Sequence, residues 1–108
     1  MLHDWERLED DDKEGALSAR LDKLWRFSDS TALVVRQLVG EDLEIRRMAV
    51  AGALSEAIDM SYTVEEMPAL HHLRTSLAEL CHRLDAQVTR LGVLYAWTYD
   101  ARAGEGQR

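Results

Sequence analysis

The fold is decided by residues 67–99, MPALHHLRTSLAELCHRLDAQVTRLGVLYAWTY. Leucines recur there at alternating spacings of three and four residues, and Gln87 occupies the position that breaks the series: Leu70, Leu73, Leu77, Leu80, Leu84, Leu91 and Leu94. This heptad spacing is typical of a helix with a narrow apolar edge. At about 1.5 Å per residue, such a helix would be roughly 45 Å long. We expect its edge to be buried against other helices of this chain, a second copy or a partner.

The composition is that of a small helical protein. The chain has 108 residues, of which 46% are hydrophobic and 31% are charged, as in a single globular domain. One proline and six glycines are too few for the turns of a many-stranded β protein. We therefore predict one all-α domain over residues 1–108, a small antiparallel bundle of about four helices with a long C-terminal helix.

Three shorter helices are predicted before the long one, at about 13–27, 31–39 and 41–61. Ser28, Asp29 and Ser30 separate the first two, because short polar side chains cap helices better than they sit inside them. Gly40 would end or bend the second helix and allow the third to begin.

The first fourteen residues hold most of the formal net charge of −7, with seven carboxylates against two basic side chains. We predict an acidic, partly flexible head over residues 1–12, and a flexible tail over residues 100–108. Within the head, the three-residue spacing of Leu2, Trp5 and Leu8 could dock a tryptophan through one helical turn. A solvated terminus is the simplest interpretation, and binding to a basic partner or imitation of a phosphate backbone is the alternative.

Several classes of location and partner are not favoured. A single cysteine, Cys81, excludes an internal disulfide and fits a reducing compartment. The N-terminal residues are acidic and lack an apolar run, so we expect no signal or transit peptide. Without a stretch of about 18 apolar residues we expect no membrane span. Without an evident basic face, nucleic acid is not the favoured partner. We predict a cytoplasmic protein.

Catalytic and metal-binding motifs are sparse. The sequence has no glycine-rich phosphate loop and no G-x-S-x-G or HExxH motif, so we predict no enzyme activity and no cofactor. Glu79 and His82 have the Glu-x-x-His spacing that diiron bundles use twice, but the motif occurs once. These two residues fall on the face away from the leucines. We therefore predict no metal site, and a small metal-binding bundle that also uses His71 or His72 is an alternative.

The end of the long helix is the best candidate for an interface. Tyr95 and Tyr99 lie on one side of the helix and Trp97 on the other, so cover is needed from two directions. Either a partner supplies this cover, or the four-helix core covers one side and the N-terminal segment with Trp5 covers the other. Tyrosine and tryptophan are frequent in interface hot spots. Gln87 could fix the register of a helix pair, or lie where the core opens to water. The predicted interface residues are Leu84, Gln87, Val88, Leu91, Leu94, Tyr95, Trp97 and Tyr99.

The leading hypothesis is a non-enzymatic helical protein–protein interaction module, such as an adaptor, chaperone, inhibitor or assembly subunit. Its partner would be another protein or a second copy, and we favour a homodimer formed through the helix at 67–99, because we expect its leucine edge to be too long for the chain's own helices to bury. The alternative functions are an acidic inhibitor that imitates nucleic acid through residues 1–14, and the metal-binding bundle.

Overall fold

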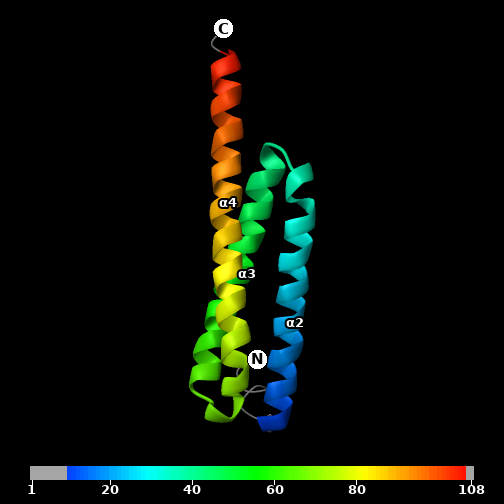
Figure 1. The fold of residues 1–108 in the computed structure, drawn as a ribbon, viewed down its shortest axis with the longest axis vertical. Helices are drawn as coiled ribbons and strands as arrows, with labels where there is room; N and C mark the ends of the chain where they lie inside the picture. Colours follow the sequence, from blue (N-terminus) through cyan, green and yellow to red (C-terminus); the bar gives the residue numbers. More distant parts are fainter. Residues whose placement is uncertain (1–9, 107–108) are drawn as a thin grey trace.

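The computed structural model describes the backbone of residues 10–106 and the side chains of residues 12–98. Three long helices run alternately up and down the molecule, as Figure 1 shows: α2 (Asp10–Val34), α3 (Glu41–Glu65) and α4 (Arg74–Gly106). Two short 3-10 helices stand at the connections, η1 (Val35–Gln37) and η2 (Pro68–Leu73). The all-α prediction is confirmed, and between residues 10 and 106 there is no strand.

The described chain has three α-helices where about four were predicted, because α2 runs through the expected break. Ser28 Oγ donates a hydrogen bond to Gln87 Oε1 of α4 at 2.9 Å. Asp29 forms an ion pair with Arg83, also of α4, at 2.9 Å. These side chains therefore bind a neighbouring helix instead of capping their own. The chain turns later, at Gly40, whose φ of 56° lies in the left-handed region that favours glycine.

The leucine edge is buried by the chain's own earlier helices. Its residues from Leu70 to Leu84, together with Leu91, are at most 9% exposed. The facing core residues come from both other helices: Leu17, Leu21 and Leu24 of α2, and Val50, Ala57 and Met60 of α3. Pro68 opens η2, where a missing backbone N–H costs nothing, and α4 follows directly. The leucine edge is thus the centre of a three-helix bundle, and the expectation that it is too long for the chain's own helices to bury is wrong for these leucines.

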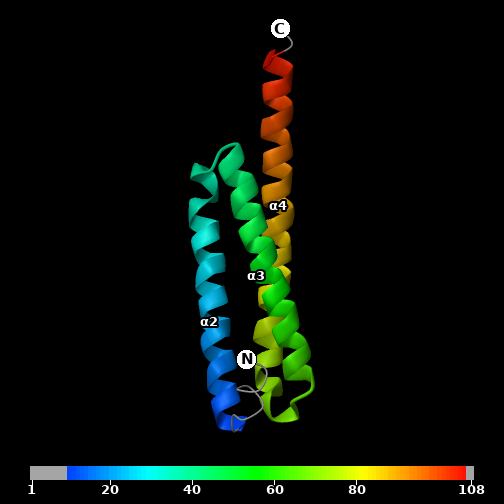
Figure 2. The same cartoon turned by 180° about the vertical axis from the view of Figure 1, so that it is seen from behind.

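The molecule is a rod of 64 × 26 × 20 Å. The C-terminal part of α4 extends past the connection between α2 and α3, as Figures 1 and 2 show from opposite sides. We predicted a helix end near residue 99, whereas α4 continues to Gly106. Of the predicted acidic head, residues 1–9 lie outside the described part, and Asp10 begins α2. No helix among the described residues combines the length and apolar character needed to cross a bilayer.

Candidate interaction surface

A second row of side chains follows α4 on a face away from the leucines. It consists of Arg83, Ala86, Arg90, Val93 and Trp97, again at spacings of three and four residues. This spacing places all five on one side of the helix. Val93 is 57% exposed and Trp97 is 73% exposed. We call this row the outer stripe; at about 1.5 Å per residue it is roughly 21 Å long.

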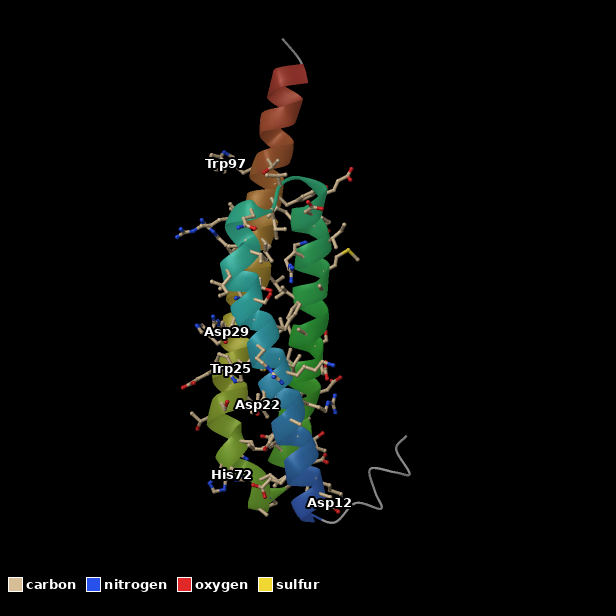
Figure 3. All side chains as sticks on the ribbon, turned by 90° about the vertical axis from the view of Figure 1, so that its right-hand side faces the viewer. Asp12, Asp22, Trp25, Asp29, His72 and Trp97 are labelled. Atoms are coloured by element: carbon tan, nitrogen blue, oxygen red, sulfur yellow. The ribbon has the colours of Figure 1, made fainter. Side chains whose placement is uncertain are left out.

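A groove of about 440 Å³ lies between α2 and α4 and includes the first part of the outer stripe. Its lining residues from the first half of the chain are Thr31, Ala32, Val35 and Arg36. Those from α4 are Arg83, Ala86, Gln87, Arg90 and Leu91. Figure 3 labels Trp25, Asp29 and Trp97 along this edge of the bundle. The groove therefore has small apolar walls, three arginines and, further along α4, an exposed tryptophan.

The floor of the groove is fixed by one polar pair. Gln87 Oε1 accepts the hydrogen bond from Ser28 Oγ, and Gln87 Nε2 donates to the Ser28 carbonyl oxygen at 3.0 Å. Ser28 is completely buried, so neither partner could exchange this contact for water without cost. The pair sets the register of α2 against α4 at the level of the groove.

Thr31 contributes an unsatisfied hydroxyl to the same groove. Its side chain is 1% exposed, and its Oγ1 is the one buried side-chain N or O atom of the described residues that lacks a hydrogen-bond partner. A buried polar atom without a partner costs about 1–3 kcal/mol.

The three arginines of the groove differ in their contacts with other side chains. Arg83 pairs with Asp29 and lies over the ring of Trp25, with 5.5 Å between its guanidinium carbon and the ring centre. Trp25 is itself held, because its indole N–H donates to Ser76 Oγ at 3.1 Å. Arg36 and Arg90 are exposed, and neither forms an ion pair with a described side chain. The groove therefore carries uncompensated positive charge in a chain of net charge −7.

The predicted interface residues are divided between core and surface. Leu84 and Leu91 are buried in the chain's own core, and Val88, Leu94 and Tyr95 pack half-buried against it. Gln87 binds Ser28, and the Tyr99 side chain lies outside the described residues. Trp97 is the member of this set with a large exposed surface.

The groove was not predicted from the sequence, for two reasons. The outer stripe has the same spacing as the leucines, but arginine and alanine at its positions hid the pattern. The contributions of Thr31 and Arg36 depend on how α2 packs against α4, and that packing follows from the unbroken course of α2. The 3-4 spacing of Arg83, Ala86, Arg90, Val93 and Trp97 was the available signal.

Elsewhere the ionisable groups form isolated contacts. At the start of α3, the hydrogen bond and positive charge of Arg47 lower the pKa of Glu44, and the same contact raises the pKa of Arg47. The Arg47 side chain also lies where α3 and α4 approach closely, since a Cβ placed on Gly92 would be 3.5 Å from Arg47 Cδ. This contact is structural and lies outside the groove.

The residues considered for metal binding are not brought together. His72 pairs with Glu14 at 2.9 Å, and Figure 3 shows His72 at the end of the bundle opposite Trp97. Glu79 and His82 are exposed on α4. Within the described part of the chain, no three His, Cys, Asp or Glu residues gather closely enough to hold a metal ion. Cys81 is half-buried, with its Sγ 3.8 Å from Ser61 Oγ.

Comparisons with known proteins add no relative: no protein family, curated protein or solved structure matches this chain.

Proposed function

We propose that this protein is a non-enzymatic, cytoplasmic protein–protein interaction module that binds its partner with the outer stripe and the groove beside it. The observation that carries the proposal is the 73% exposure of Trp97 on the same helical face as the groove arginines. Tryptophan and arginine are the side chains that most often dominate binding energy at interfaces. Adaptor, chaperone, inhibitor and assembly-subunit roles all use such a surface.

Self-association through α4 is the form of this function that we favour. The leucine edge is occupied within the chain, but the outer stripe lies on the same helix and is open. A rod with a groove along one side can pair lengthwise with a second rod, which buries more surface than an end-to-end contact. The dimer would thus use the predicted helix through a face other than the leucines.

Light scattering coupled to size-exclusion chromatography, over a range of protein concentrations, tests this proposal. We expect a dimer for the unmodified chain and a shift to monomer for Trp97→Ala. Tyr62→Ala is the matched control, because Tyr62 is 64% exposed but lies on α3. A chain that is monomeric at every concentration and captures no other protein would contradict the proposal.

A further inference from the structure

We propose that the groove between α2 and α4 binds the acidic N-terminal segment, residues 1–12, of a second copy of this chain. The inference rests on the proposed function and names the partner that this function leaves open. It follows from four properties: the charge of the groove, the composition of the segment, the reach of the chain and the positions of both along the rod.

The charges of the groove and the segment are complementary. Arg36, Arg83 and Arg90 line the groove, and the first and last of these have no ionic partner among the described side chains. The segment carries six carboxylates and one arginine within twelve residues. Arginine forms short, charge-assisted and often bidentate hydrogen bonds with carboxylates. The chain as a whole is acidic, whereas this groove is positively charged. The groove should therefore attract the acidic N-terminal segment electrostatically.

The apolar residues of the segment also have a complement. Leu2, Trp5 and Leu8 recur every three residues between the carboxylates. The groove offers the small walls of Ala32, Val35 and Ala86, and the outer stripe continues from it to the exposed Val93 and Trp97. A segment with apolar and acidic residues interleaved can therefore fill the groove and meet its arginines at the same time.

Trp5 and the carboxylates of the segment cannot reach the groove of their own chain. Trp5 is five residues before the start of α2 at Asp10, which allows at most about 18 Å of fully extended chain. Thr31 lies 21 residues beyond Asp10 along an unbroken helix, a distance of about 32 Å. The occupant must therefore come from another molecule.

An antiparallel pair of rods satisfies both contacts at once. The groove lies toward the end of the bundle where α2 gives way to η1, since Thr31, Val35 and Arg36 line it. The first residues of α2 lie at the opposite end of the bundle (Figures 1 and 2). Side by side and antiparallel, each copy places its N-terminal segment beside the groove of the other. The two contacts are equal and the pair is closed by two-fold symmetry. A parallel, head-to-tail arrangement would instead produce open chains of molecules.

Two modified chains test the two sides of the contact, the N-terminal segment and the groove, one at a time. Deletion of residues 1–9 removes the apolar residues of the segment and three of its six carboxylates, and it leaves α2 complete, with the other three carboxylates in its first turn. Arg36→Glu with Arg90→Glu reverses two exposed charges of the groove. Arg26→Glu with Lys23→Glu is the control, because it reverses two exposed charges of α2 that lie outside this groove. We expect each of the first two chains to dimerise at least about tenfold more weakly than the unmodified protein, and the control to dimerise normally.

Mixing the two defective chains is the decisive measurement, by sedimentation velocity. The truncated chain keeps its groove and the doubly substituted chain keeps its segment, so the mixture should form a heterodimer at concentrations where each chain alone is mostly monomeric. A fluorescent peptide of residues 1–12 should also bind the truncated chain, more weakly as salt is raised, and a peptide of scrambled order should not. If the truncated chain dimerises normally while Trp97→Ala is monomeric, this inference fails and the proposed function stands. If truncation, the arginine reversals and Trp97→Ala all leave the oligomeric state unchanged, both fail.

Discussion

Gln87 of α4 and Ser28 of α2 form two hydrogen bonds with each other. Ser28 Oγ donates to Gln87 Oε1, and Gln87 Nε2 donates to the Ser28 carbonyl oxygen. The pair stands where the leucine series of α4 is interrupted, and it explains how the bundle accommodates a polar side chain at this position. A leucine at this position would be apolar but would leave the fully buried Ser28 hydroxyl without a partner.

Replacing Gln87 tests this explanation. We expect Gln87→Leu to lower the free energy of unfolding by about 1–3 kcal/mol, because the Ser28 hydroxyl loses its acceptor. The double variant Ser28→Ala with Gln87→Leu should recover a large part of that loss, since both polar groups are then absent. Urea unfolding of the four chains of this cycle gives the coupling between the two residues. A Gln87→Leu chain more stable than the unmodified protein would refute the explanation.

Replacing Thr31, unlike replacing Gln87, should raise the free energy of unfolding. Its buried Oγ1 has no partner in the described structure, so Thr31→Val keeps the shape of the side chain and removes an unsatisfied hydroxyl. We expect the variant to be more stable by about 1 kcal/mol, seen as a higher midpoint of thermal unfolding. Thr89→Val on the exposed side of α4 is the control and should change stability little. A loss of stability in Thr31→Val would mean that the hydroxyl has a partner.

The leucine edge and the outer stripe should differ sharply in their contribution to folding. Leu80 is 0% exposed, so Leu80→Ala should lower the free energy of unfolding by about 2–5 kcal/mol. Val93 is 57% exposed, so Val93→Ala should change it by less than about 0.5 kcal/mol. Chemical unfolding at a protein concentration where the chain is monomeric gives both values. Equal effects of the two substitutions would show that the faces of α4 were assigned wrongly.

Acidification should weaken the start of α3. Arg47 lowers the pKa of Glu44 in the folded chain, so the ion pair stabilises the fold at pH values above about 4.3, the ordinary pKa of a glutamate. That stabilisation is lost as the pH falls through the lowered pKa. We therefore expect the urea midpoint to fall less between pH 7 and pH 3 in Glu44→Gln than in the unmodified chain.

Glu79→Gln is the matched control for this pH series. Glu79 is exposed and forms no ion pair with another described side chain, so its substitution should leave the fall in midpoint unchanged. Identical pH curves for Glu44→Gln and the unmodified chain would show that the Glu44–Arg47 contact does not contribute to stability.

Contacts between polar residues far apart in the chain could not be predicted from the sequence. The heptad spacing was sufficient to predict the helical class, since apolar periodicity depends on the sequence alone. It did not show which helices cover the leucine edge, and α2 and α3 of the same chain bury most of an edge that was expected to need a second chain. Ser28 and Asp29 led to a wrong helix count, because the bonds that keep them inside α2 come from Gln87 and Arg83, some sixty residues away in the chain. The groove was not predicted for a similar reason, because its lining residues are brought together by the way α2 packs against α4.

The unequal lengths of the helices also have a kinetic consequence. The first part of α4 is covered by α2 and α3, whereas its last turns extend past both of them (Figure 2). Amide hydrogens near Leu80 should exchange with solvent deuterium only when the whole bundle opens, while those near Gly106 depend on local fraying alone. The exchange rates of the α4 amides should therefore rise gradually along one continuous helix, from the buried turns near Leu80 to the last turn at Gly106.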